Sequence, residues 1–301
     1  MPVVLASLFL ASATISPPSD VPLPPAEQSA IVVQGQRASE RQIRNFIQEL
    51  TPAHVHGQLG RFESPMCPAA IGLSPVQNEQ VKVRMRSVAE AAGMEVAKAK
   101  CHPNVVVIVT RDKNALLKRI GSKRGDYFPI GQSGFNYHSL LDSGTPVAAW
   151  QIEQTRGADG RKLQEVRNSN EVGRDGVLVQ RVFGSATRLT PMARQEFAAS
   201  VVVIQADALV GLTTTQLADY AAMRAFVRTD PSKLTASAAN SILNAVTTPI
   251  GAPVPLTLTA WDMSFLKAYY ASRLNNFAAN QRSEMREKMS QDLGGQEEPA
   301  Q

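Results

Sequence analysis

The sequence is poor in the residues that build metal and redox centres. Its 301 residues include four histidines and two cysteines, and no histidine follows His138. Zinc in proteins is held by histidine, cysteine or carboxylate ligands, and histidine is the one that supplies nitrogen. The second half of the chain therefore offers no nitrogen ligand. His54 and His56 form a His-x-His pair, but no nearby residue offers the third ligand that such a site needs. We therefore predict no metal site and no cofactor.

Motifs of other common activities are also missing. The chain has no G-x-S-x-G of serine hydrolases and no G-x-x-x-x-G-K phosphate loop. Its formal net charge of +5 is not enough to imply a nucleic-acid partner, and we predict none. One stretch, residues 111–124, is strongly basic. We interpret it as a solvated face, with contact to an anionic lipid or polysaccharide as the alternative.

Long apolar runs are absent, so we predict no transmembrane segment. The run VVLASLFLA at residues 3–11 is too short to span a bilayer. Ala11-Ser12-Ala13 follows it and fits a small-residue cleavage site. We predict a signal peptide and export to the periplasm or the extracellular space, with a mobile apolar tail as the alternative. Residues 1–30 are thus a signal peptide and a proline-rich linker, ahead of a single domain at 31–275.

The most strongly patterned part of the chain is Val201–Arg228. Its first four residues are apolar and predict a strand. The segment Thr213–Gln216 has the T-x-x-Q pattern of a capping box, which marks the start of a helix. Almost every residue of Leu217–Val227 is apolar, so the helix is expected to be buried on most sides. We predict a central helix around which the other elements pack.

A strand, a helix and a second strand are predicted earlier in the chain. The helix begins at Ser74-Pro75-Val76-Gln77, where serine is the N-cap and proline the first helical residue. Asn104–Thr110, NVVVIVT, is typical of a buried strand. Such a unit favours two neighbouring parallel strands.

The two cysteines lie on either side of this helix. In an exported chain two cysteines most simply pair, so we predict a Cys67–Cys101 disulfide. The pairing requires a first strand that begins beside Cys67, mainly at Pro68–Gly72. If the strand is instead Leu59–Pro65, the bond is disfavoured, and the alternative is two buried free thiols.

Three further segments receive predictions. Pro146–Gln154, PVAAWQIEQ, is expected to be an edge strand that contains Trp150. Thr190–Phe197 is expected to be a short helix before the strand at Val201. Residues 276–301 are expected to form a polar helical tail with a disordered end, outside the domain.

The order of segments in the second half resembles the zincin-like metallopeptidase fold, in particular the metzincins. Ser241-Ile242-Leu243-Asn244 is similar to the turn that passes beneath the metal in that family, with Leu243 in place of a methionine. Leu258–Tyr270 resembles the family's closing helix, and the likeness covers about residues 59–272. The chain also resembles a group of exported bacterial proteins with this layout. The resemblance implies an α+β fold with a mixed twisted sheet, a buried central helix and a C-terminal helical part.

The chain departs from that family at the residues that carry its chemistry. Zinc catalysis there needs H-E-x-x-H on the central helix, where two histidines hold the metal and the glutamate polarises a bound water. The corresponding turns here, Gln216–Met223, read QLADYAAM. Asp219 could stand where the glutamate was, but we interpret it as a salt-bridge or capping partner of a neighbouring loop. We expect the fold to be kept and the zinc site to be lost.

These expectations favour an exported, non-catalytic pseudo-peptidase that binds a peptide or a cell-envelope component in a former substrate cleft. The candidate binding residues are Asp219, Tyr220 and Trp150, and the strand at Trp150 would supply main-chain hydrogen bonds. The alternative is a hydrolase with an atypical metal site, built from the histidines of the first half. A third hypothesis is a structural role in the envelope through the basic residues 111–124. The sequence makes no prediction of the oligomeric state.

Overall fold

A computed structural model describes residues 39–51, 57–123, 128, 137–142, 144–168, 177–181, 190–229 and 241–294. The chain divides into two compact units, Met1–Val32 and Val33–Gln301, and all the described residues belong to the second. The predicted signal peptide and linker lie outside the described residues, and so do His54 and His56.

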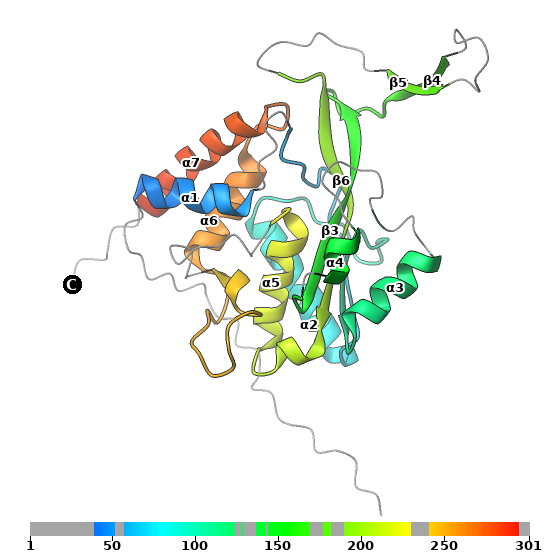
Figure 1. The fold of residues 1–301 in the computed structure, drawn as a ribbon. Helices are drawn as coiled ribbons and strands as arrows, with labels where there is room; N and C mark the ends of the chain where they lie inside the picture. Colours follow the sequence, from blue (N-terminus) through cyan, green and yellow to red (C-terminus); the bar gives the residue numbers. More distant parts are fainter. Residues whose placement is uncertain are drawn as a thin grey trace, which may run out of the picture. The chain divides into compact units, whose positions relative to one another are not determined.

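A four-stranded mixed sheet lies at the centre of the fold (Figure 1). Its strands, in spatial order, are β1 (Pro68–Ile71), β2 (Val105–Thr110), β6 (Ala193–Gln205) and β3 (Val147–Gly157). The first three are parallel, whereas β3 runs antiparallel to β6 at the edge. The sheet confirms the prediction of an α+β protein with a mixed sheet, at this coarse level. It also confirms the edge strand around Trp150.

The β1–β2 connection confirms the predicted disulfide. The connecting helix α2 (Pro75–Ala91) begins at a Ser74 capping box, and β1 pairs with β2 in parallel. Cys67 directly precedes β1, which is the position that the pairing requires. It is bonded to Cys101 with a Cα–Cα distance of 6.0 Å. The backbone N–H of Cys67 also donates to the side-chain oxygen of Asn104 at 2.8 Å, which holds the two strand starts together.

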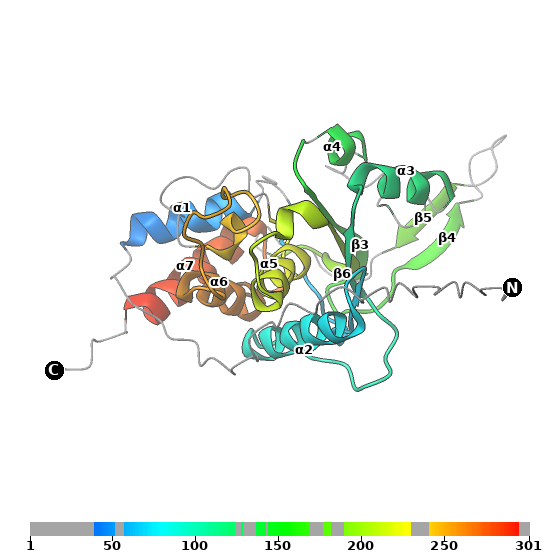
Figure 2. The same ribbon diagram turned by 90° about the horizontal axis from the view of Figure 1, so that it is seen from below.

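Helices cover both faces of the sheet (Figure 2). The helices α2 and α5 (Thr214–Phe226) lie on one face, and α3 (Lys113–Lys123) and α4 (Tyr137–Asp142) lie on the other. Side chains of β3 alternate between the two resulting cores, as the pleat of a strand requires. Val147 belongs to the larger core on the α5 side, and Ala148 and Trp150 belong to the smaller core on the α3 side.

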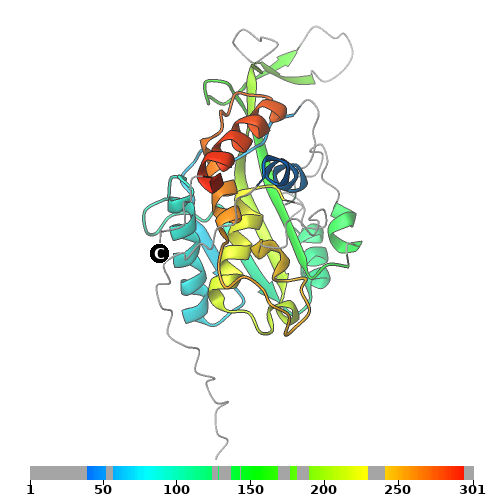
Figure 3. The ribbon, with the colours of Figure 1, turned by 90° about the vertical axis from the view of Figure 1, so that its left-hand side faces the viewer.

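Three helices, one from the start of the described chain and two from its end, form a layer beside α5 (Figure 3). They are α1 (Glu40–Leu50), α6 (Ala260–Ala271) and α7 (Ala278–Gly294), and α7 packs against both of the others. Met285 and Met289 of α7 are fully buried, because they lie one turn apart on the face that meets these helices. The helix within 276–301 is therefore part of the same compact unit as the sheet, and no division of the chain falls at residue 275.

The predicted helix at Thr190–Phe197 is wrong from Ala193 onward, because β6 begins there and runs unbroken to Gln205. The segment ARQEFAAS contains good helix formers, but its pairing with the distal half of β3 overrides that local preference. Glu196 supports this ribbon through ion pairs with Arg156 and Arg194. Beyond the ribbon, β4 (Gln164–Asn168) and β5 (Val177–Arg181) form a separate two-stranded sheet.

None of the helices in the described ranges is long and apolar enough to cross a lipid bilayer.

We predict that the double variant Cys67→Ser/Cys101→Ser lowers the free energy of unfolding by about 4 kcal/mol. The bond spans 34 residues, and the chain-entropy model gives about that loss for a loop of this length. Urea denaturation of the wild type and the variant measures the difference. Reduced wild-type protein is the control, and equal stability of the oxidised and reduced forms would contradict the prediction.

Candidate functional site

The central helix α5 is enclosed on almost every side. Every residue from Gln216 to Phe226 is buried except Arg224. The helix begins with the predicted capping box, in which Thr213 accepts from the backbone of Gln216 and the Gln216 side chain accepts from the backbone of Thr213. Gln216 also donates to the carbonyl of Pro255 at 2.8 Å, so the start of α5 is tied to the segment before α6.

Asp219 is the only carboxylate on α5, and it is fully buried. Arg84 of α2 donates two hydrogen bonds to this carboxylate, from Nε to Oδ1 at 2.7 Å and from Nη2 to Oδ2 at 3.0 Å. The Thr257 hydroxyl and the Leu258 backbone N–H donate to Oδ2 at 2.7 and 2.9 Å. This geometry confirms the interpretation of Asp219 as a salt-bridge partner that also holds a neighbouring loop.

These contacts determine which chemistry Asp219 and its neighbour Tyr220 can perform. Oδ2 of Asp219 accepts three hydrogen bonds and Oδ1 accepts one, so the carboxylate already holds about as many donors as its lone pairs can serve. Tyr220 beside it is 2% exposed, and burial raises the pKa of its hydroxyl while the charge of Arg224 partly opposes that rise. The carboxylate is occupied and the phenol stays protonated at neutral pH. Neither group is available as a general base.

A second buried carboxylate, Asp262, fixes the turn that follows α5 in the chain. This turn, η5 (Ile242–Asn244), contacts α5. Asp262 Oδ1 accepts from the Ser241 hydroxyl at 2.6 Å, and Oδ2 accepts from the Ile242 N–H at 2.9 Å. Thr259 supplies two further donors through the capping box of α6. Burial raises the pKa of Asp262, although these hydrogen bonds partly counteract the rise.

The sequence signalled only one of the two functions of Asp262. Thr259-Ala260-Trp261-Asp262 has the T-x-x-D pattern of a capping box, which predicts the bond of Asp262 to Thr259. Nothing local signals its bond to Ser241, because the two residues lie 21 positions apart. Arg84 was missed for the same reason, since it lies 135 positions from Asp219.

The edge strand β3 presents free main-chain groups beside α5. The backbone N–H of Gln205 donates to the carbonyl of Pro146 at 2.8 Å, which sets the register of the β3–β6 ladder. Main-chain groups alternate in direction along an antiparallel strand, so those of Ala148 and Trp150 face β6. Those of Ala149 and Gln151 face outward, and within the described parts of the chain they have no hydrogen-bond partner.

The side chain of Gln151 links this edge to the end of α5. Its amide donates to the carbonyls of Arg224 at 2.9 Å and Val227 at 3.3 Å. The last carbonyls of a helix lack partners within the helix, and Gln151 satisfies two at this end. Close by in sequence, Glu153 of β3 and Arg228 form an ion pair at 2.7 Å. The free edge is therefore anchored firmly beside the central helix.

The structure does not gather the three predicted binding residues into one cluster. Asp219 and Tyr220 are buried on α5, on one face of the sheet. Trp150 is 3% exposed and lies in the core on the α3 side, where its ring packs on Phe128 with centroids 4.9 Å apart. A binding role for these side chains stays a prediction, whereas the disulfide of Cys67 and Cys101 is confirmed.

Among the described residues, no group of three histidine, cysteine or acidic side chains could hold a metal ion. His102 and His138, the two histidines in that part of the chain, both have exposed side chains.

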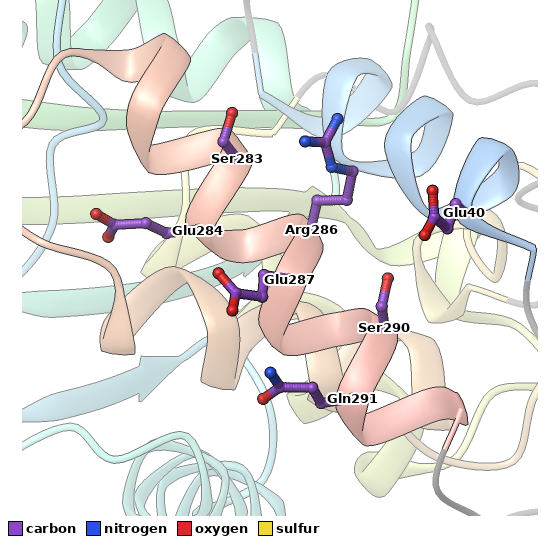
Figure 4. A pocket seen from close by; sticks show the side chains of 7 residues that line it. All are labelled: Glu40, Ser283, Glu284, Arg286, Glu287, Ser290 and Gln291. Carbon is purple, nitrogen blue, oxygen red and sulfur yellow. The ribbon is translucent and has the colours of Figure 1, made fainter.

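A surface hollow of about 700 Å³ runs along α7 beside the start of α1 (Figure 4). Its lining side chains are polar or charged. Glu40 comes from α1, and the others come from the two flanks of α7: Ser283, Glu284, Arg286, Glu287, Ser290 and Gln291. None of these residues belongs to α5 or β3, so the hollow is not part of the candidate site.

We predict that Arg84→Met destabilises the protein by about 3 kcal/mol, because it leaves the buried Asp219 carboxylate without its cation. The double variant Arg84→Met/Asp219→Leu should be more stable than Arg84→Met alone, since it removes the uncompensated charge. Lys82→Met is the matched control on the same helix. Its ion pair with Glu79 is at the surface, where such pairs contribute less than about 1 kcal/mol. Chemical denaturation checks all three, and equal losses for Arg84→Met and Lys82→Met would contradict the assignment.

We predict that Asp262 makes the stability depend on pH. Its pKa in the folded state is raised above the ordinary value of 3.8, so above pH 3.8 the folded state binds the proton more tightly than the unfolded state. The free energy of unfolding should therefore fall as the pH rises from 3.8 through the folded-state pKa. Asp262→Asn, which does not titrate, should remove this slope. Urea denaturation at a series of pH values measures it, and an unchanged slope in the variant would contradict the role given to Asp262.

Comparison with known proteins adds no relative to this description. No protein-family model, no curated protein and no solved structure matches the chain. The family of the chain is therefore not established. The structure supports the coarser description of a mixed α and β protein, with a four-stranded mixed sheet and a buried helix on one face of it.

Proposed function

We propose that this chain is a non-catalytic protein of zincin-like architecture that binds an extended peptide along the edge of β3. The peptide could be free or part of a cell-envelope component. The observation that carries the proposal is that the outward main-chain groups of Ala149 and Gln151 have no hydrogen-bond partner among the described residues. The disulfide and the sequence pattern of residues 3–13 support an exported protein.

The arrangement of elements supports the zincin-like part of the proposal. The antiparallel edge strand β3 neighbours β6, and β6 leads directly into the central helix. The turn η5 contacts that helix, as the turn beneath the metal is expected to do in the resemblance. The closing helix α6 begins at Ala260, within the segment that resembles the family.

The contacts of α5 support the absence of catalysis. A hydrolase of this type needs space and ligands for a metal on the central helix. In this chain the helix turns at Gln216–Met223 are buried, and the carboxylate of Asp219 is saturated by Arg84, Thr257 and Leu258. A ligand would thus meet the strand edge and not the helix.

Strand addition follows from the chemistry of such an edge. An extended peptide can pair with outward N–H and C=O groups, and main-chain bonds then give affinity with little dependence on sequence. Ala149 supplies one donor and one acceptor, and Gln151 supplies the same pair two residues later. The Gln151 side chain is already engaged with α5 and holds the strand in place. Gln151 is only 3% exposed, so Ala149, which is half-buried, offers the more accessible of the two pairs.

We predict that Ala149→Pro weakens peptide binding about fivefold, because proline removes one outward N–H and one hydrogen bond contributes about 1 kcal/mol. An edge strand tolerates proline where the lost N–H faces outward, so the variant should still fold. Peptides are first selected from a phage-displayed random library against the wild type. The best synthetic peptide is then titrated calorimetrically against the wild type, Ala149→Pro and the control Ala149→Val, which keeps the N–H.

Two outcomes would contradict the proposal. One is a selection in which no peptide is enriched over selection without protein. The other is equal affinity of Ala149→Pro and Ala149→Val. Stoichiometric zinc that survives dialysis, together with peptide cleavage, would favour the hydrolase instead.

A further inference from the structure

Large apolar side chains are exposed at one end of the sheet. Six in the described ranges are more than half exposed: Ile71, Val76, Val83, Val210, Ile250 and Leu256. We call these six residues the carboxyl rim, because they lie at or near the carboxyl ends of the parallel strands. Their exposed fractions run from 54% for Val83 to 79% for Leu256. Isolated exposed apolar residues are ordinary, but their collection at one end of a molecule points to a contact surface.

The topology places the first members of the rim together. Ile71 is the last residue of β1, and Val76 lies in the first turn of α2. Val210 follows the end of β6 after a single short helical turn, η2 (Ala206–Leu209). The carboxyl ends of parallel strands meet at one edge of a sheet, so these three residues share that edge.

Side-chain bonds bring Leu256 to the same edge. Gln80, one turn after Val76, accepts from the Thr214 hydroxyl at the start of α5 at 3.1 Å. Pro255 and Thr257, which flank Leu256, are bonded to Gln216 of α5 and Arg84 of α2. Leu256 therefore projects beside the starts of both helices. Ile250 lies in the same connection between η5 and α6, and Val83 precedes Arg84 on α2.

Positive charge accompanies the rim. β2 ends at Thr110, so Arg111 lies at the same edge, and α3 leads away from it with Lys118 and Arg119. All three of these basic side chains are exposed. The exposed acidic residues nearby are Asp112 and Asp207, and Glu79 is paired with Lys82. The exposed charge at 111–119 is thus positive on balance.

We propose that the carboxyl rim docks on an anionic lipid surface. The apolar side chains come from four separate elements or connections and are separated by polar residues. Side chains that are separated in this way can each insert shallowly among lipid headgroups. They do not form the continuous groove that a peptide or a helix would need. Arg111, Lys118 and Arg119 would contact the anionic headgroups, whose attraction adds to that of the buried apolar area. This proposal does not depend on peptide binding at β3.

Co-sedimentation with vesicles tests this surface. The wild type should bind vesicles of equal parts phosphatidylglycerol and phosphatidylcholine, and it should bind phosphatidylcholine vesicles far less. Ile250→Ser/Leu256→Ser should lower the partition coefficient about fivefold, because two inserted side chains are lost. Arg111→Glu/Arg119→Glu should lower it by at least as much. Both pairs are exposed, and circular dichroism verifies that the variants fold.

A charge-matched variant distinguishes binding through this face from binding that depends only on the net charge of the protein. Arg286→Glu/Lys288→Glu makes the same change of charge on exposed residues of α7, and it should bind much more tightly than Arg111→Glu/Arg119→Glu. The proposal is overturned if the wild type does not bind the anionic vesicles at low salt. It is equally overturned if the serine variant binds as well as the wild type, or if the two charge variants lose binding equally.

Discussion

The bidentate ion pair between Arg84 and Asp219 is the interaction on which the rest of the structure depends. It places a carboxylate at the centre of an apolar helix and supplies the cation that makes its burial tolerable. Through the same two side chains it joins α2, α5 and the segment that leads into α6. Here a guanidinium on the neighbouring helix provides the positive charge.

Under the proposed function, this closed helix leaves a ligand the edge of the sheet and not α5. Asp219 and Tyr220 form part of the core, and Asp262 uses its buried carboxylate to fix the turn that contacts α5. The buried carboxylates of Asp219 and Asp262 therefore already have hydrogen-bond partners within the protein. The main chain of β3 is different, because an edge strand has no neighbour for half of its hydrogen-bonding groups. Binding through that edge requires none of the groups that catalysis would need.

Local patterns in the sequence predicted the elements well. The capping boxes at Ser74 and Thr213 both mark helix starts, because a cap depends on residues three positions apart. The disulfide was predicted because two cysteines in an exported chain most simply pair, and Cys67 lies directly before β1, as that pairing requires. What failed depends on distant partners. Ala193–Phe197 joins a strand through pairing with β3, and Met285 and Met289 are buried only because α1 and α6 meet them. The partner of Asp219 lies on another helix and has no local signal.

Amide hydrogen exchange along β3 tests the central claim most directly. If the edge is free and α5 closed, the amides of Ala149 and Gln151 exchange quickly, while those of Ala148, Trp150 and Ile152 are protected by β6. The amides in the middle of α5 should exchange only when the whole protein unfolds. Uniform protection along β3 would show that its edge is covered, and rapid exchange in the middle of α5 would show that the helix is open. Either result would contradict a closed core beside a free strand.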